Sequence, residues 1–270
     1  RALRRRKTAD WTVVLILCGI AVCCGGYLIY HHWSVKQREL EYEKLRQEET
    51  LSAATETVIA EPETEESTEE TVIYCDPVYD FGQLHEQNED IYAWIVVPGT
   101  QVDYPLLQSG TDNYYLDYNL DHSKGYPGCI YTNQCNRKDF SDYNTVLYGH
   151  NMKNGSMFGS IHSFEDETFF DGHPYIYVYT ENERLTYEIY EAAKFTDVYI
   201  PSEYVISSKD DRDQFLADVR EKVSDNKLHV REDMEIGEED RLITLSTCVS
   251  GERNHRYLVI GVLVETALYR

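Results

Sequence analysis

The chain has 270 residues and a formal net charge of −23, with 23 tyrosines and three methionines. Its acidity argues against a nucleic-acid-binding protein, because such proteins neutralise phosphates with Lys and Arg, and it disfavours docking of the folded part on an anionic lipid surface. The many aromatic residues favour a β-rich domain. Once the N-terminal segments are set aside, about 190 residues remain, enough for one domain with its own core.

The seven cysteines are unevenly spread and do not form the dense pattern of a disulfide framework. Three of them lie inside the apolar N-terminal stretch. Cys129 and Cys135 bracket one short expected strand and could form a disulfide, although ordinary thiols are the favoured interpretation. The sequence leaves the redox state of this pair open.

The N-terminus has the composition of a membrane anchor. Residues 1–10 hold a basic cluster, and residues 11–30 are apolar over about the length that a helix needs to cross the hydrocarbon layer. Trp11 and Trp33 fit the aromatic belts at the two interfaces. Because basic segments stay in the cytoplasm, we predict a cytoplasmic tail, an uncleaved transmembrane anchor and an extracellular remainder. A cleaved signal peptide and a lipid-modified Cys23 are the less favoured alternatives.

Residues 31–75 are predicted to form an acidic extracellular linker. Charges at helical spacing over 36–49 suggest a short stalk helix, whereas 61–70 is rich in Glu and Thr and lacks aromatic residues. Such a stretch buries too little apolar surface to offset its ordering entropy. We therefore expect a tether that is extended by charge repulsion, and a partner site within it is the less favoured interpretation.

The folded domain is expected over residues 76–270 and is mainly β. Phe81, Leu84 and Ile91 suggest a short amphipathic helix at its start. Turn residues separate eight β-like runs, which lie at 94–97, 102–107, 129–132, 145–148, 175–180, 185–195, 242–248 and 257–264.

Two helices are expected among these strands. A shorter one covers about 157–164, and a longer one covers 208–223, where Ser208 and Asp211 resemble a capping box. Many short strands with few inserted helices predict a closed or partly closed β-barrel with peripheral helices.

Cys248 is the strongest candidate for a nucleophile. It ends an apolar strand, and Ser246 and Thr247 bring polar groups to that end as the chain leaves the core. A supported and partly exposed position of this kind suits a reactive thiol. A lone cysteine is more often structural, so the assignment depends on further groups.

His150 and Arg256 supply such groups. His150 follows an apolar run through Gly149, which we expect to allow a sharp backbone turn. Arg256 directly precedes the last strand, which fixes its position, whereas Arg253 is expected in a loop. A thiolate, an imidazole that carries protons and a guanidinium that stabilises a developing oxyanion together suit acyl transfer.

The sequence resembles the sortases, membrane-anchored cysteine transpeptidases of Gram-positive bacteria, and most closely their class B. The most specific similarities are Tyr148-Gly149-His150-Asn151-Met152, Thr244-Leu245-Ser246-Thr247-Cys248 and the downstream Arg256. The resemblance covers nearly the whole of 76–266 in the family's order. Shorter matches are Trp94-Ile95, Pro98-Gly99-Thr100, Asp103-Tyr104-Pro105, Tyr115-Leu116, Gly128-Cys129-Ile130-Tyr131 and Met157-Phe158.

This resemblance implies an eight-stranded sortase-type β-barrel with N-terminal helices and one inserted late helix. It implies His150, Cys248 and Arg256 as catalytic residues. The residues that it implies for substrate binding are Leu116, Tyr148, Tyr199, Ile200 and Ser246. The sequence contains no recognisable metal cluster or phosphate-binding glycine loop, and no cofactor is expected.

The resemblance also implies an activity. The enzyme would cleave a C-terminal sorting signal (NPxT-like) after Thr through a thioacyl-enzyme and transfer the protein to an amine of cell-wall peptidoglycan or its lipid-linked precursor. The expected partners are therefore secreted proteins with such a signal, the acceptor and the membrane, without nucleic acid. The expected location is the cell membrane, with a single pass, a cytoplasmic N-terminus and an extracellular catalytic domain.

Three alternatives stay open at this point. A pilin-polymerising sortase would use a lysine acceptor, a cysteine protease would use water, and a wall-binding domain would have no catalytic activity. The sequence does not identify the substrate protein, the variable positions of its motif, the acceptor amine or the oligomeric state.

Overall fold

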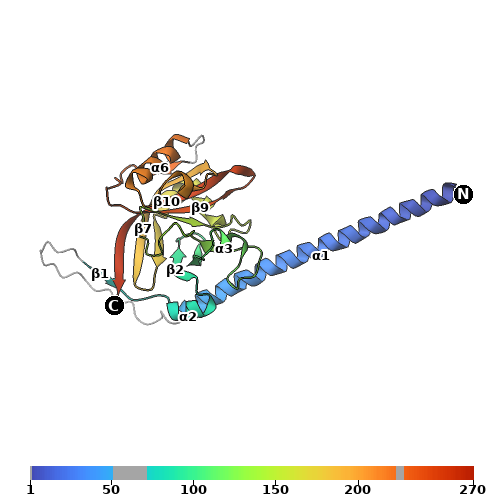
Figure 1. The fold of residues 1–270 in the computed structure, drawn as a ribbon, viewed down its shortest axis with the longest axis horizontal. Helices are drawn as coiled ribbons and strands as arrows, with labels where there is room; N and C mark the ends of the chain where they lie inside the picture. The colour runs from blue at the N-terminus through green and yellow to red at the C-terminus, as the bar shows by residue number, and fades with distance from the viewer. Residues whose placement is uncertain (1, 51–71, 223–227) are drawn as a thin grey trace. The chain divides into compact units, whose positions relative to one another are not determined.

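The computed structural model describes residues 2–50, 72–222 and 228–270, and the chain divides into two units, Arg1–Leu45 and Arg46–Arg270. The first unit consists of most of helix α1 (Ala2–Thr50), which is drawn in blue in Figure 1 and ends within the second unit. This helix contains a segment that is long and apolar enough to cross a membrane by length and composition. The expected stalk at 36–49 is helical, whereas most of the acidic stretch expected to be a tether lies outside the described residues.

Eight strands of the second unit close into a barrel, as expected. Their order is β10-β9-β5-β4-β3-β2-β6-β7, and β7 closes the barrel by pairing with β10. The strands are β2 (Ile91–Val96), β3 (Asp103–Leu107), β4 (Ile130–Tyr131), β5 (Asn144–Tyr148), β6 (Tyr175–Tyr179), β7 (Glu183–Thr196), β9 (Leu242–Val249) and β10 (Glu252–Tyr269).

Two short strands extend this barrel. β8 (His229–Val230) pairs with β7, and β1 (Ile73–Cys75) pairs in parallel with the end of β10. Residues 73–75 were expected in the linker, but here they belong to the sheet. Backbone pairing with β10 explains the difference, since a three-residue strand has little hydrophobic periodicity of its own.

The last strand is longer than its apolar run predicted. β10 begins at Glu252 rather than near Tyr257, because Ser250 and Gly251 form a tight connection in which Val249 pairs with Glu252. Gly251 adopts φ +81°, a conformation that glycine tolerates at no steric cost. Arg253 therefore lies within β10 and not in a loop.

The helices lie mostly where they were expected. α2 (Phe81–Gln87) opens the domain with its N-terminus capped by Asp80, and the 3₁₀ helix η1 (Gly159–Glu165) occupies the place of the shorter predicted helix. In the late helix α6 (Lys209–Lys222), the Asp211 amide donates to Ser208 Oγ at 3.3 Å, as the capping pattern predicted. The remaining helices are α3 (Tyr114–Asp117), α4 (Glu167–Gly172) and α5 (Ile200–Glu203).

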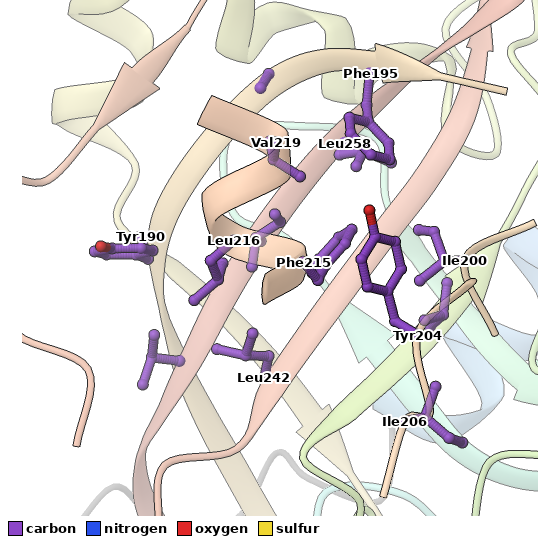
Figure 2. Close-up of a cluster of buried hydrophobic side chains, with 14 residues drawn as sticks. Tyr190, Phe195, Ile200, Tyr204, Ile206, Phe215, Leu216, Val219, Leu242 and Leu258 are labelled. Atoms are coloured by element: carbon purple, nitrogen blue, oxygen red, sulfur yellow. The ribbon is translucent and has the colours of Figure 1, made fainter. Parts of the chain in front are cut away.

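Helix α6 covers one side of the barrel with its apolar face. Figure 2 shows Phe215 of α6 among the side chains of Phe195, Tyr204 and Ile200. The ring of Phe215 meets those of Phe195 and Tyr204 edge to face, at centroid distances of 5.9 and 5.3 Å. Such burial contributes roughly 1.5–3 kcal/mol for one side chain of this size. This cluster also holds Ile200, the residue that follows Tyr199.

Candidate active site

Strand β9 carries Cys248 out of the core to the surface. Residues 242–247 are buried, and Cys248 is exposed. The strand lies between β5, which is parallel to it, and β10, which is antiparallel. The Thr247 hydroxyl donates to the Gly149 carbonyl at 2.8 Å and so fixes the last buried residue against the end of β5. The thiol therefore stands on a supported strand end, as a reactive cysteine requires.

Arg256 is the direct partner of Cys248 in the register of β9 and β10. Residues directly opposite each other have Cβ atoms about 4.5–5.5 Å apart and project from the same face, so the half-buried arginine starts beside the thiol. Its Nη1 donates to the carbonyls of His255 at 3.0 Å and Arg253 at 3.3 Å. Arg253 is exposed and lies in the irregular stretch between Glu252 and Arg256.

His150 follows β5, whose last residue Tyr148 pairs with Ser246. This pairing places His150 at the level of Cys248. Its Nε2 lies 2.9 Å from the Leu116 carbonyl oxygen, which can only accept, so Nε2 carries a proton. Nδ1 is then the nitrogen that gains or loses the second proton. The ring of Tyr126 lies 4.8 Å from the imidazole, between centroids.

Gly149 is required for space rather than for a special backbone angle. We expected it to allow a sharp turn, but its φ lies outside the left-handed region that other glycines of the domain occupy. A Cβ at this position would lie 2.5 Å from Ile130 Cδ1 and 2.8 Å from Phe158 Cδ2. The glycine thus lets the end of β5 approach the core closely, and this approach places His150.

The three candidate catalytic residues line one cavity of about 340 Å³. Four of the five expected substrate-binding residues, Leu116, Tyr148, Tyr199 and Ser246, line it as well. Ile200 does not; it is 2 % exposed and belongs to the core cluster under α6. The other lining residues are Asn113, Tyr131, Gly149, Asp197, Val198 and Thr247.

The tyrosines give this cavity a largely neutral aromatic wall. Burial raises the pKa of Tyr148 and of Tyr131, and it raises the pKa of Tyr199 to about 12. Their hydroxyls therefore stay protonated near neutral pH. The rings of Tyr148 and Tyr199 are stacked 6.2 Å apart, and Asn133 Nδ2 donates to the Tyr199 hydroxyl at 2.9 Å. Such a wall suits an uncharged stretch of peptide.

Cys129 and Cys135 are not joined to each other. Cys129 is buried and Cys135 is exposed, and both are free, so the disulfide left open by the sequence is not formed. Cys135 Sγ lies 3.8 Å from the Tyr199 hydroxyl. Its pKa is raised by partial burial, which makes it a poorer nucleophile than an ordinary cysteine at neutral pH.

One residue close to the thiol was missed by the sequence. His162 is not among the candidates that the sequence indicates, but its Nε2 lies 3.0 Å from the Cys248 carbonyl oxygen. A weak signal was present, because His162 lies in the shorter predicted helix and Glu165 directly follows its predicted end. Their spacing of three residues brings side chains together on a helix. Nothing in the sequence pointed from this pair to Cys248.

Comparisons with known proteins identify relatives of this chain. A model of the sortase domain matches residues 95–264. Sortase B of Listeria monocytogenes is 34 % identical over 168 residues, which make up 61 % of this chain and 65 % of that protein. Sortase B of Staphylococcus aureus is 26 % identical over 261 residues, which make up 95 % of this chain and 97 % of that protein.

A solved structure supports the same relationship. The structure of the Staphylococcus aureus sortase B–substrate complex superposes with a TM-score of 0.66 at 26 % identity and covers 85 % of this chain and 97 % of that one. The family model spans more than half of the chain, and it includes the strand ends that carry His150, Cys248 and Arg256. The chain therefore belongs to the sortase family, and within it to class B.

Proposed function

We propose that this chain is a cysteine transpeptidase that joins a secreted protein to the cell wall. Its substrate would be a C-terminal sorting signal of the NPxT type, cleaved after the threonine. The observation that carries the proposal is the convergence of Cys248, Arg256 and His150 on one cavity from three neighbouring strands. The NPxT motif itself rests on the resemblance to class B.

In the first half-reaction, the Cys248 thiolate attacks the threonine carbonyl carbon. The Arg256 guanidinium donates hydrogen bonds to the oxyanion that forms, for which it would leave the carbonyls it now contacts. The carbon–nitrogen bond then breaks, and protonated His150 gives its proton to the leaving amine. The product is a thioester between Cys248 and the threonine.

In the second half-reaction, an amine of peptidoglycan or its lipid-linked precursor attacks the thioester. His150 takes the proton from this amine, and the Cys248 thiolate leaves as the new amide bond forms. The histidine and the cysteine thus return to their starting charge states. Neither half-reaction requires a redox partner.

The cavity wall supports binding of an extended peptide. Leu116 and Tyr199 are partly exposed, at 39 % and 38 %, and offer apolar surface on the rim, while Ser246 lies beside the nucleophile. Ile200 contributes indirectly, because it packs in the core and thereby fixes the position of the preceding residue, Tyr199. We infer that residues of the sorting signal before the threonine lie along this wall.

We further propose that helix α1 anchors the enzyme in the cell membrane. Its apolar segment supports a single pass, and the basic residues before that segment favour a cytoplasmic N-terminus. The catalytic domain would then lie outside the cell, where secreted proteins and the wall meet. We assign residues 1–10 to the cytoplasmic tail, 11–30 to the membrane span and 31–72 to the linker. The catalytic domain then covers 73–270, because strand β1 belongs to its sheet.

The full chain in detergent, given an NPxT peptide and triglycine, tests the activity. We expect a ligated product by mass spectrometry, and a Cys248→Ala variant should form none. The Cys135→Ser variant is the matched control, because it removes an exposed thiol near the same cavity, and it should keep nearly all activity. Unchanged cleavage by Cys248→Ala would show that the nucleophile is another residue.

The same assay separates the alternatives. Hydrolysis without ligation at high triglycine would indicate a cysteine protease. Ligation to a lysine side chain in preference to triglycine would indicate a pilin polymerase. Absence of cleavage together with binding to isolated cell walls would indicate a wall-binding domain, and the proposed reaction would then be wrong.

A further inference from the structure

The β5–β9 ladder stops at the proposed nucleophile. The Gly149 amide donates to the Ser246 carbonyl at 3.3 Å. Because successive carbonyls of a strand alternate between its two edges, the Cys248 carbonyl faces the same neighbour. The Asn151 side chain reaches it, with Nδ2 at 2.8 Å from the Cys248 oxygen. A side-chain amide thus satisfies the Cys248 carbonyl where the ladder ends.

His162 is the second group at this carbonyl. Its Nε2 lies 3.0 Å from the Cys248 oxygen and 3.0 Å from Asn151 Nδ2. Its Nδ1 lies 2.7 Å from Glu165 Oε1, which as a carboxylate only accepts, so Nδ1 carries a proton. In the imidazolium form, Nε2 of His162 donates directly to the Cys248 carbonyl oxygen. In the neutral form, Nε2 accepts from Nδ2 of Asn151, and Nδ2 also donates to the Cys248 carbonyl oxygen. The carbonyl therefore keeps a donor in both protonation states.

The surroundings hold His162 in this position. The ring is stacked on Tyr257 at 4.9 Å between centroids, and Tyr257 pairs with Thr247 next to the Arg256–Cys248 pair. The side chains of His162 and Glu165 are 21 % and 23 % exposed. The imidazole is thus held by a carboxylate of its own helix and by the strand that carries Arg256.

An open cavity adjoins Asn151 and His162, the two residues that bond this carbonyl. It has a volume of about 490 Å³ and is lined by Asn151, His162, Glu165, Val249 and Ser250, among others. Water can therefore reach the Cys248 carbonyl if its donors are removed. Hydration would stabilise other orientations of the peptide, because the carbonyl would no longer depend on one fixed pair of donors.

We propose that Asn151 and His162, the latter held by Glu165, are positioning residues that fix the Cys248 peptide and thereby aim its thiol. The inference rests on the proposed role of Cys248 as nucleophile. A fixed carbonyl fixes the direction of the adjoining Cα–Cβ bond, and so the place of Sγ relative to His150 and Arg256. A displacement of about 1 Å in such a constellation can cost about 100-fold in rate.

Kinetics of ligation by the full chain test this role. We expect His162→Ala to lower kcat about 10- to 100-fold and to change KM less than about threefold, because the peptide groove is untouched. His162→Gln places a side-chain amide near the position of Nε2 and should restore most of the kcat that His162→Ala loses. His173→Ala is the matched control, since His173 also bonds a carbonyl, that of Phe169, and is stacked on a ring, yet is absent from both cavities. It should keep kcat within about twofold.

Alkylation of Cys248 gives a readout that needs no sorting signal. The rate of iodoacetamide modification, followed on the Cys248 peptide by mass spectrometry, should fall in His162→Ala and recover in His162→Gln. Slower alkylation in His162→Ala would support the positioning role even if the wild-type chain ligates nothing. The experiment therefore distinguishes failure of the positioning role from failure of the proposed transpeptidase activity.

Three results would overturn the inference. The first is wild-type kcat and alkylation in His162→Ala. The second is a loss of activity that merely follows a lowered thermal midpoint, as a stability defect would produce. The third is a His162→Gln variant that folds like the wild type but is as slow as His162→Ala.

Discussion

At the scale of single residues, the site depends on which of two neighbouring arginines stands beside the thiol. Both Arg253 and Arg256 lie on β10, so membership of a strand does not separate them. The register does, because Arg256 pairs with Cys248 and Arg253 falls in the irregular stretch. We infer that only Arg256 stabilises the oxyanion.

Replacement of Arg256 by Ala should therefore lower kcat for peptide cleavage about 100- to 1000-fold, the usual cost of one lost oxyanion donor. Arg256→Lys should restore only part of the lost kcat, because an ammonium group lacks the planar, forked arrangement of donors of a guanidinium. Arg253→Ala is the neighbouring control and should stay within about twofold of wild type. A larger effect at Arg253 than at Arg256 would reverse the assignment.

A second residue-scale prediction concerns Glu191, which is fully buried on β7. Burial raises its pKa from 4.5 to about 7, against the opposing effect of Arg220, whose Nε lies 3.4 Å from Glu191 Oε2. As pH rises from about 4.5, the unfolded chain releases this proton first. The free energy of unfolding should therefore fall by about 3 kcal/mol by the time pH passes about 7.

Glu191→Gln removes this titration and should flatten the pH dependence of stability between about 4.5 and 7 by the same amount. Guanidinium unfolding across this range measures it. Glu188→Gln, a half-buried change on the same strand, is the control and should leave the wild-type slope in place. An equally steep slope in both variants would mean that another group titrates.

At the scale of elements, the end of β5 determines where His150 stands. Gly149 is the residue through which this end approaches Ile130 and Phe158. α6 has a comparable role on another side, because its apolar face packs in the cluster that also buries Ile200. Both elements therefore support the site without supplying a catalytic group.

Gly149→Ala should cost about 1–3 kcal/mol of stability through overpacking, because Phe158 is fully buried and cannot yield freely. It should also lower kcat, since relief of the clash moves the end of β5 that carries His150. Chemical denaturation and ligation kinetics measure the two effects. Gly110→Ala is the control, because an added Cβ there meets no atom within 4 Å among the described residues beyond its chain neighbours. Wild-type stability in Gly149→Ala would show that the neighbouring side chains rearrange at no cost.

Phe215→Ala tests the packing of α6. It removes a fully buried ring and its two aromatic contacts, so we expect a loss of about 3–5 kcal/mol in the free energy of unfolding. Gln214→Ala changes the exposed neighbour and should cost less than about 0.5 kcal/mol. Similar losses at the two positions would contradict the packing seen in Figure 2.

At the scale of the whole molecule, an apolar helix and an acidic catalytic domain share one chain. The strongly negative charge makes adsorption of the domain to anionic lipid unfavourable, so we expect any association with a membrane to come from the apolar segment of α1.

The full chain should therefore float with vesicles in a density gradient, and a chain without residues 1–33 should stay in the aqueous fraction. High salt should not release the full chain, because apolar burial is not screened by ions. Flotation of the shortened chain would locate membrane affinity in the domain instead.

The sequence by itself determined the kind of molecule. Apolar length and basic flanks predicted the anchor, alternating runs predicted the eight strands of the barrel, and Cys248, His150 and Arg256 were picked out from their places at strand ends. These features are local, because periodicity and turn residues act within a few positions along the chain.

Only the tertiary structure decided how these parts meet. It placed Arg256 opposite Cys248 and buried Ile200 in the core cluster instead of the cavity wall. It also brought His162, which is distant in the chain, to the Cys248 carbonyl. Register and contacts across the barrel depend on how distant segments pack, and no local pattern encodes them. The candidate nucleophile Cys248 was visible in the sequence, whereas the contacts of Asn151 and His162 with its carbonyl appear only when the barrel closes.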